Sequence, residues 1–461
     1  MPLLIQNGEI ITATDRYRAD IYCEDQTITA IAPRIEPPPD ATIIDARDKY
    51  IFPGFIDPHV HIYLPFMGTY AKDTYPTASR AALLGGTTTL IEMICPARND
   101  DPLEAYQLWH SQAAGKSACD YTFHMGVTRF DESTPDALRQ IVADGVASFK
   151  VFLAYKGALG INDTELYHTL RLARSLGVIT TAHCENADLI AELQKQLLSE
   201  GKTAPEYHYH SRPPRVEAEG TRHLLTFAEL TGAPVYIVHL SCAEALQEAL
   251  GARQRGVACW IETLIQYLVL DHSYTQRPDF EGAKYVMSPP LRDRANHEVL
   301  WNALRQGFIH TVATDHAPFD FRGQKDLGRD NFTLIPNGIP SLEDRITVLY
   351  TYGVRRHHID LHQFVAAAST QAAKIFGLYP RKGTIQLGSD ADLVIFDPHY
   401  KTTISARTHH MNVDYNPFEG WPLEGRAETV TVRGRIMVRD GQFIGEMGYG
   451  QFLRRTPHYH C

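Results

Sequence analysis

The sequence has 461 residues, of which 44% are hydrophobic and 21% charged, with a formal net charge of −10. This composition is that of an ordinary globular protein, and the negative charge argues against a nucleic-acid partner, because phosphate would be repelled. No apolar run approaches the roughly 18 residues of a membrane span. No basic residue precedes the first apolar stretch, so we expect no signal peptide and a cytoplasmic protein without membrane contact.

The cysteines also fit a reducing compartment. The seven cysteines, at positions 23, 95, 119, 184, 242, 259 and 461, form no C-x-x-C pair and no framework spacing. We therefore expect free thiols in a cytosolic protein.

Both ends of the chain have the pattern of short β-strands. Apolar runs at 3–5, 9–11, 20–22 and 28–31 are separated by turn or loop signals such as Asn7-Gly8. Segments 391–396 and 430–438 have the same pattern of short apolar runs. We expect one small discontinuous β-sandwich domain formed by residues 1–52 and 381–461, including a C-terminal tail.

The middle of the chain, residues 53–380, alternates apolar runs with helical patterns, as parallel α/β folds do. Eight strands are predicted, at 55–57, 88–93, 121–125, 148–152, 178–183, 235–239, 259–263 and 309–315. Helices are predicted at 164–173, with Asp163 as a candidate N-cap, at 186–200 and at 217–230. Eight such units in order predict a (β/α)8 TIM-like barrel, whose usual size is about 250 residues.

Chemically active residues stand at or just past the carboxyl ends of five predicted strands, where barrel enzymes place their catalytic groups. They are His59 and His61 after the first strand, Lys150, His183, His239 and Asp315. Each alone is more often structural than functional. Together, four imidazoles and a carboxylate form a ligand set suited to zinc or a similar divalent metal. A catalytic zinc uses about three protein ligands, so the number of donors favours two metals.

Lys150 admits two interpretations at this point. An ammonium beside two cations would have to lose its proton, and its reaction with CO2 would give a carbamate whose oxygens could bridge a metal pair about 3.5–4 Å apart. Alternatively, Lys150 is an ordinary lysine paired with Asp315 or another acid. The residues alone leave both interpretations open.

Several motifs extend along nearly the whole chain. They are Gly85-Gly86-Thr87-Thr88-Thr89, Phe149-Lys150-Val151-Phe152-Leu153-Ala154-Tyr155-Lys156, His183-Cys184-Glu185-Asn186, Val238-His239-Leu240-Ser241-Cys242, Ser288-Pro289-Pro290-Leu291-Arg292, Thr314-Asp315-His316-Ala317-Pro318-Phe319, Gly323-Gln324-Lys325 and Ile335-Pro336-Asn337-Gly338. With them the sequence resembles the amidohydrolase superfamily, and closely its dihydropyrimidinase/hydantoinase branch. The stretch 285–345 is the most specific part of the resemblance.

The resemblance implies a role for each strand-end residue. One divalent metal, most simply Zn²⁺, would be bound by His59, His61 and Asp315, and a second by His183 and His239, with Lys150 as N6-carboxylysine bridging both. The family's oxyanion-assisting tyrosine falls on Tyr155, and its backbone contacts to the ring fall on Ser288 and Asn337.

The implied activity is hydrolysis of a dihydropyrimidine or hydantoin ring to an N-carbamoyl amino acid. The expected nucleophile is a hydroxide bridging the two metals, with Asp315 as general base and then acid. Loops after the first and fourth barrel strands would shape the pocket for the ring substituent, and the candidates are Leu64, Phe66, Phe152 and Leu159. Plain loop packing explains these four equally well.

Three alternatives remain. An allantoinase is a close neighbour, and a dihydroorotase would be expected to carry an arginine at the position of Tyr63. From a different class, a non-catalytic dihydropyrimidinase-like scaffold shares the fold but lacks the metal ligands, which this chain retains in full. The physiological ring substrate is left open.

The resembling enzymes are commonly tetramers, so a homotetramer is expected. Segment Arg212-Pro213-Pro214-Arg215 matches the family and is a candidate subunit contact. His208, His210, His409, His410 and the tail Pro457-His458-Tyr459-His460-Cys461 are expected at the surface or at an interface.

Overall fold

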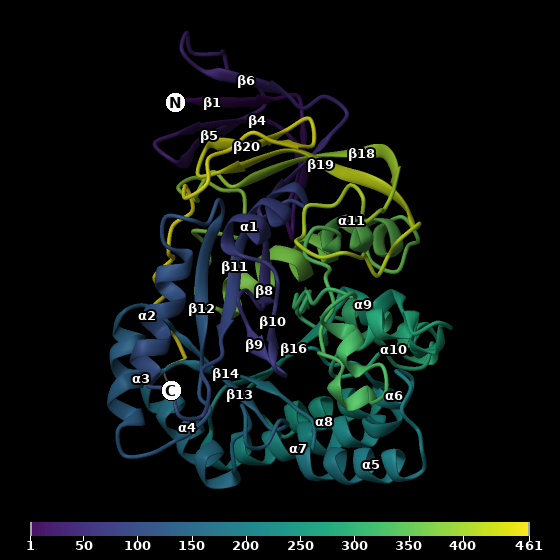
Figure 1. The fold of residues 1–461 in the computed structure, drawn as a ribbon. Helices are drawn as coiled ribbons and strands as arrows, with labels where there is room; N and C mark the ends of the chain where they lie inside the picture. The colour runs from purple at the N-terminus through teal and green to yellow at the C-terminus, as the bar shows by residue number, and fades with distance from the viewer. Residues whose placement is uncertain (1, 460–461) are drawn as a thin grey trace.

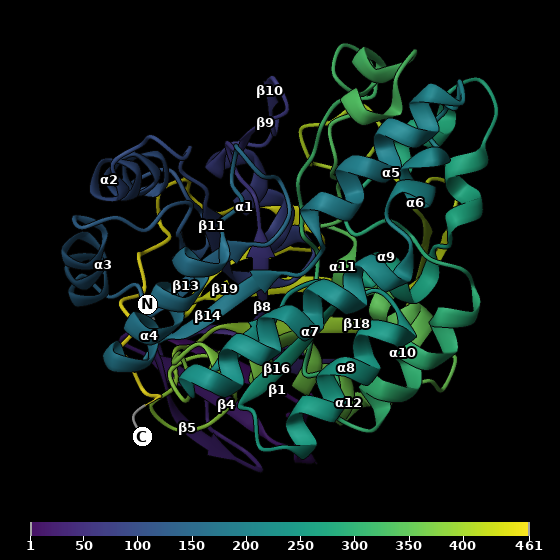
Figure 2. The ribbon, with the colours of Figure 1, turned by 90° about the horizontal axis from the view of Figure 1, so that it is seen from below.

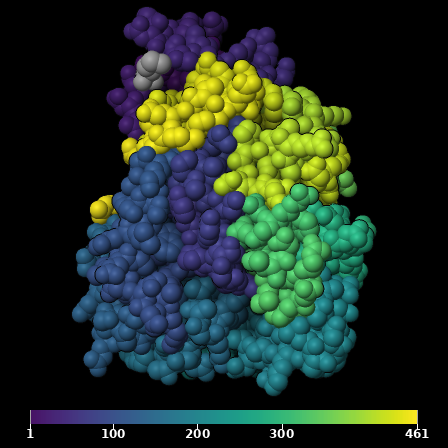
Figure 3. Space-filling model, viewed as in Figure 1, coloured from purple at the N-terminus to yellow at the C-terminus, as the bar shows by residue number. Residues whose placement is uncertain are grey.

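The protein combines a parallel barrel with a smaller β unit at one end, in a computed structural model that describes residues 2–459 (Figure 1). Both termini contribute to the β unit, and Figure 3 shows the purple N-terminal and yellow C-terminal segments together there. His460 and Cys461, expected in a surface tail and among the free thiols, lie outside the described residues.

Eight strands form the barrel in chain order, and all neighbouring pairs are parallel. They are β8 (Phe55–Val60), β11 (Thr87–Ile94), β12 (Asp120–Gly126), β13 (Ser148–Phe152), β14 (Ile179–His183), β15 (Val235–Ile237), β16 (Cys259–Leu264) and β17 (Thr311–Ala313). Nearly all of their side chains are buried, as expected where helices cover the outside of a parallel sheet. The predicted (β/α)8 fold is confirmed.

Helices surround this barrel in a ring, seen from below in Figure 2. They are α1 (Tyr75–Leu84), α2 (Pro102–Ala113), α3 (Thr134–Ala143), α4 (Asp163–Leu176), α5 (Ala187–Ser199), α6 (Tyr207–Ser211), α7 (Pro214–Thr231), α8 (Ala243–Gln254), α9 (Ile265–Val269), α10 (Ala295–Arg305), α11 (Arg345–Leu349), α12 (Leu361–Val365) and α13 (Gln371–Ile375).

Local capping fixes where these helices begin. The N-cap of α4 is Asn162 rather than the predicted Asp163, because Asn162 has the extended backbone of a cap and Asp163 is already helical. The Asn162 side chain accepts a hydrogen bond from the Glu165 amide at 2.9 Å, and the Glu165 carboxylate accepts one from the Asn162 amide at 2.8 Å. Gly177, in the left-handed region, ends the helix.

The β unit contains two sheets. The first has the order β5-β4-β1-β6, with β1 (Leu3–Gln6), β4 (Asp20–Glu24), β5 (Thr27–Ala32) and β6 (Thr42–Asp45). The second has the order β21-β20-β19-β18-β7-β2-β3, with β2 (Glu9–Ile11), β3 (Arg16–Arg18), β7 (Tyr50–Pro53), β18 (Leu393–Thr403), β19 (Pro422–Val432), β20 (Arg435–Arg439) and β21 (Gln442–Phe443).

The two chain ends meet where β7 pairs with β18. Apolar side chains from both ends, among them Leu3, Ile10, Ile51 and Leu393, form one core cluster. The discontinuous β-sandwich is therefore confirmed, whereas the exact boundaries at residues 52/53 and 380/381 stay a prediction. The predicted run 430–438 is two strands, β19 and β20, because the chain turns at Arg433 with φ +45°.

The barrel closes between β8 and β17 largely through a buried arginine. The guanidinium of Arg345, at the start of α11, donates from Nη1 to the carbonyls of Ile56 at 2.8 Å and Val312 at 2.9 Å, one on each strand. Its Nε lies 3.7 Å from Oδ2 of Asp57, and both side chains are wholly buried. One side chain therefore ties the first strand to the last.

A second set of contacts closes the seam nearer the site. The hydroxyl of Thr314 donates to Oδ2 of Asp57 at 2.7 Å, and the amide of His61 donates to the carbonyl of His316 at 2.8 Å. Val60 and His316 form an isolated parallel bridge. These bonds fix the end of β8 against the residues that follow β17.

We expect Arg345→Met to destabilise the protein by about 3–5 kcal/mol, because it leaves the Asp57 carboxylate buried without its cation. The matched control is Arg355→Met, which breaks the half-exposed pair with Glu424 and should cost at most about 1 kcal/mol. Thermal unfolding at a fixed scan rate measures both. Equal unfolding temperatures for the two variants would contradict the role given to Arg345.

Candidate metal centre

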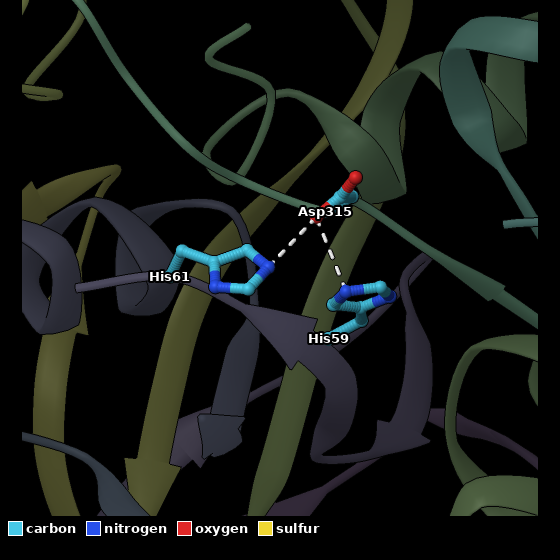
Figure 4. Close-up of side chains that lie close together, drawn as sticks. All are labelled: His59, His61 and Asp315. Atoms are coloured by element: carbon cyan, nitrogen blue, oxygen red, sulfur yellow. Dashed lines mark ion pairs between the residues drawn. The ribbon is translucent and has the colours of Figure 1, made fainter. Parts of the chain in front are cut away.

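The first group of candidate ligands lies at the seam. His59 and His61 alternate with Val60 at the end of β8, so both imidazoles point to one side (Figure 4). Their Nε2 atoms both lie 3.1 Å from Oδ1 of Asp315. The donor atoms of these three side chains lie within 4.8 Å of one another, which is the spacing of a metal site.

Two of the candidate residues lie past their strands rather than at the ends. β15 stops at Ile237 and β17 at Ala313, so the predicted ends at His239 and Asp315 are wrong by two residues. His239 has φ +42° and Asp315 has φ +49°, in the left-handed region that non-glycine residues rarely adopt. Such strain is typical of functional sites, because it turns a side chain out of the strand's alternation.

The second group is a facing pair of histidines. Nδ1 of His183 lies 2.9 Å from Nε2 of His239, and both side chains are buried. The other ring nitrogen of His183, Nε2, lies 2.8 Å from Oε2 of Glu185, which also accepts from Nη1 of Arg212 at 2.6 Å. Similarly, Nδ1 of His59 lies 2.7 Å from Oε1 of Glu262. Carboxylates behind imidazoles in this way orient metal ligands.

Lys150 lines the same cavity as these two groups, and its Nζ lies 4.8 Å from the centroid of the Phe152 ring. Its side chain is 0% exposed, and its Nζ has no hydrogen-bond partner in the described part of the chain. The pair with Asp315 or another acid that the ordinary-lysine interpretation required is therefore not found among residues 2–459. Burial lowers the pKa of Lys150, which favours the neutral amine. A buried amine with no acceptor is the arrangement that a carbamate would complete.

The pKa values of His59 and His61 are shifted in opposite directions. Burial lowers the pKa of His61 to about 4. Burial also opposes the charge on His59, but the carboxylates of Asp315 and Glu262 outweigh it and raise the pKa to about 9. Burial raises the pKa of Asp315 in turn, yet the two imidazoles hold it well below its usual value. Nitrogen and carboxylate donors in a desolvated pocket fit divalent metal ions of the zinc type.

One cavity contains every site residue predicted from the sequence. Its lining includes His59, His61, Leu64, Phe66, Lys150, Phe152, Tyr155, Leu159, His183, His239, Ser288, Asp315 and Asn337. Cys95, Ala317 and Gly338 also line it and were not predicted. The structure thus brings the candidates together, while the role of each stays a prediction.

Tyr155 lies over the second histidine group. Its ring centroid is 5.3 Å from that of His183 and 5.2 Å from that of Phe66, and the Arg212 guanidinium lies 5.5 Å from its ring centroid. Burial raises the pKa of the Tyr155 hydroxyl, so it is protonated and can donate a hydrogen bond. Its φ of +62° is a further strained backbone in this cavity.

The structure corrects one expectation about a neighbouring residue and adds a contact for another. His208 is 2% exposed rather than at the surface, and its Nε2 lies 2.9 Å from the carbonyl of Met287 and 3.1 Å from Oγ of Ser288. Arg212 of the segment Arg212-Pro213-Pro214-Arg215 is also buried and pairs with Glu185, whereas Arg215 is exposed, and the predicted subunit contact of this segment stays a prediction. Both residues were overlooked because only the fold brings α6 and its following loop behind the cavity.

The carboxylates behind the ligands were also missed. Glu185 follows His183 by two residues in a motif that the sequence singled out, so that motif was the available signal. Glu262 lies within β16, and nothing in its local sequence distinguishes it from other buried polar residues.

Comparisons with known proteins agree with this geometry. The model of the Amidohydrolase family matches residues 50–437. D-hydantoinase of Geobacillus stearothermophilus is 48% identical over 460 residues, covering 99% of this chain and 97% of that protein. The crystal structure of D-hydantoinase (dihydropyrimidinase) from Thermus sp. is 63% identical with a TM-score of 0.98, covering 99% of this chain and 100% of that one. The structure of dihydropyrimidinase from Brevibacillus agri is 45% identical with a TM-score of 0.98, covering 99% of both chains.

We expect His59→Ala and His61→Ala each to lower the bound metal from two equivalents to about one or fewer, because each removes a donor from the group around Asp315. Activity should fall with the metal, while circular dichroism stays that of the folded barrel. Metal analysis per chain measures the effect, with the exposed His210→Ala as control. Two retained equivalents in both variants would contradict the assignment.

Proposed function

Since the chain belongs to the amidohydrolase family, we propose that it hydrolyses a cyclic amide or imide ring, namely a hydantoin or a 5,6-dihydropyrimidine, to an N-carbamoyl amino acid. The observation that carries the proposal is the convergence in one cavity of four histidines, Asp315 and Lys150, whose amine has no hydrogen-bond partner in the described part of the chain. The full-length similarity to D-hydantoinases and dihydropyrimidinases supports the same ring chemistry.

The residues present fit two divalent metal ions, for which zinc is our proposal. His59, His61 and Asp315 would hold one, His183 and His239 the other, and Lys150, carboxylated by CO2, would contact both. Such ions, when bound, make water acidic and polarise the carbonyl of a ring amide. The unpaired Nζ of Lys150 supports the carbamate, because it leaves a buried polar atom that the protein itself does not satisfy.

The protein's own groups divide the remaining work. Asp315 would accept the proton of the attacking water and then deliver it to the leaving ring nitrogen. The Tyr155 hydroxyl would donate to the carbonyl oxygen as negative charge develops there. Ser288 and Asn337 would hold the ring. Both side chains lie within hydrogen-bonding reach of the Tyr155 hydroxyl.

Apolar side chains form another wall of the cavity. Leu64, Phe66, Phe152 and Leu159 belong to one cluster of apolar residues that also contains Tyr155. We propose that this wall receives the substituent of the ring, since burial of each CH₂ contributes about 0.8 kcal/mol. An unsubstituted ring would leave it partly unfilled.

The alternatives are less well supported. The position at which a dihydroorotase would carry an arginine is Tyr63, which packs against the ring of Tyr75 and offers no cation. A non-catalytic scaffold would not need six converging donors. Allantoin stays a possible ring and belongs in the substrate test.

We propose a cytoplasmic homotetramer without nucleic-acid partners. The six cysteines among residues 2–459 are free and buried, in keeping with a reducing compartment. The net charge of −10 disfavours binding to phosphate backbones. Within the described residues, no helix combines the length and apolar character needed to span a bilayer.

The test of the proposed function is a ring-opening panel on purified, metal-analysed protein, with dihydrouracil, hydantoin, a 5-substituted hydantoin, allantoin and dihydroorotate. We expect opening of hydantoin or dihydrouracil, with N-carbamoyl products identified by mass spectrometry. Activity confined to dihydroorotate would overturn the substrate assignment. No ring opening with well under two metal equivalents would favour the scaffold.

We expect Tyr155→Phe to lower kcat by about two to three orders of magnitude. Removal of one oxyanion donor usually raises the activation free energy by about 2.7–4 kcal/mol, which corresponds to this loss of rate. KM and metal content should change little, because the ring packing and the ligands remain. Steady-state kinetics with metal analysis checks both. A variant with an unchanged kcat would exclude the donor role.

A further inference from the structure

The motif Gly323-Gln324-Lys325 has no part in the proposed chemistry, yet it lies directly behind the cavity. Lys325 begins the short 3-10 helix η3 (Lys325–Gly328). Neither Gln324 nor Lys325 lines the cavity itself. Their side chains contact segments that adjoin two different walls of it.

Lys325 joins two chain segments that are far apart in sequence. Its side chain is 0% exposed, and its Nζ donates to the carbonyls of Val286 at 3.0 Å and Pro336 at 2.9 Å. The amide of Gly338 also donates to the Val286 carbonyl at 3.0 Å. Burying an amine among carbonyls alone has a desolvation cost that an apolar side chain of this size would avoid. Lys325 adds a second, side-chain connection between the two segments beside the backbone bond from Gly338 to Val286.

Those two segments carry the proposed ring-binding residues. Ser288 follows Val286 by two positions, and Asn337 directly follows Pro336. Both face the cavity. His208 holds the first segment from the other side, through the Met287 carbonyl and the Ser288 hydroxyl. Lys325 therefore acts together with the Gly338–Val286 backbone bond in holding Ser288 at its distance from Asn337.

Gln324 makes the equivalent connection to the apolar wall. Its Nε2 donates to Oγ1 of Thr69 at 2.6 Å and to the carbonyl of Tyr70 at 2.9 Å, while its Oε1 accepts from the Asp320 amide at 2.6 Å. Thr69 and Tyr70 form strand β10 (Thr69–Tyr70), which pairs with β9 (Pro65–Phe66) in a hairpin. Thr69 lies directly opposite Phe66, whose ring faces the cavity.

We propose that Gln324 and Lys325 are positioning residues for two walls of the cavity: Lys325 spaces the ring-binding residues Ser288 and Asn337, and Gln324 holds the hairpin that presents Phe66 to the ring substituent. The inference rests on the proposed function. Its consequence is a division of effects between adjacent residues. Loss of the Lys325 contacts weakens the binding of every ring substrate. Loss of the Gln324 contacts changes the preference among ring substituents.

The experiment compares Lys325→Met and Gln324→Met, which remove the polar contacts at similar side-chain length, with the exposed Lys202→Met as control. Each is assayed on hydantoin and on 5-phenylhydantoin, with metal content and thermal unfolding measured alongside. We expect Lys325→Met to raise KM for both rings by about tenfold or more, with two metals retained and the ratio of the two kcat/KM values kept. Gln324→Met should change that ratio by about tenfold and leave kcat/KM for hydantoin within about threefold of the wild-type value.

A second lysine variant covers the case in which Lys325→Met does not fold. The amide nitrogen of Lys325→Gln lies one bond closer to the backbone than Nζ, so it cannot bridge both carbonyls, and KM should rise for both rings. Unchanged KM values in any folded, two-metal Lys325 variant would overturn the inference, as would an unchanged substrate ratio in Gln324→Met. A wild-type protein that opens neither ring would instead refute the proposed function.

Discussion

The site depends on how the barrel closes. The first and last strands do not share a regular ladder, and polar side chains hold them together: Arg345 contacts a carbonyl on each strand, and Thr314 bonds to Asp57. This closure places His59 and His61, after the first strand, against Asp315, after the last. Because buried polar groups without partners are costly, the network admits little freedom in register. The first ligand group follows from this closure.

The ligands are held from behind by a second layer of charge. Glu262 contacts His59 and Glu185 contacts His183, and Arg212 balances the charge of Glu185. These carboxylates fix the orientation of each ring, so the nitrogens face inward before any ion binds. The amine of Lys150 meets no hydrogen-bond acceptor among the described residues. The pocket is polar but incomplete at one point, which is where the proposed carbamate would form.

The walls of the cavity come partly from the barrel strands and partly from loops that are held by hydrogen bonds. Barrel strands and the residues just past their ends supply the ligands, whereas longer loops supply the residues proposed to contact the ring, and loops need support to hold a geometry. Lys325, Gln324 and His208 provide that support through bonds to backbone carbonyls and to the Thr69 and Ser288 hydroxyls. The motif Gly323-Gln324-Lys325 matched the family without an evident use. Its contacts support the proposed role of positioning two walls of the cavity.

The sequence by itself predicted the eight barrel strands, the terminal β-sandwich and the meeting of the four histidines with Asp315, because alternating apolar runs define strands and their carboxyl ends must meet. The family resemblance added the proposed ligand role of Lys150. Family motifs added Tyr155, Ser288 and Asn337. Only the tertiary structure decided the rest. It showed His208 and Arg212 behind the cavity, Glu262 behind His59, and no hydrogen-bond partner for the Lys150 amine among the described residues. Local patterns cannot predict such contacts, because they join residues tens to hundreds of positions apart and their burial depends on the whole fold.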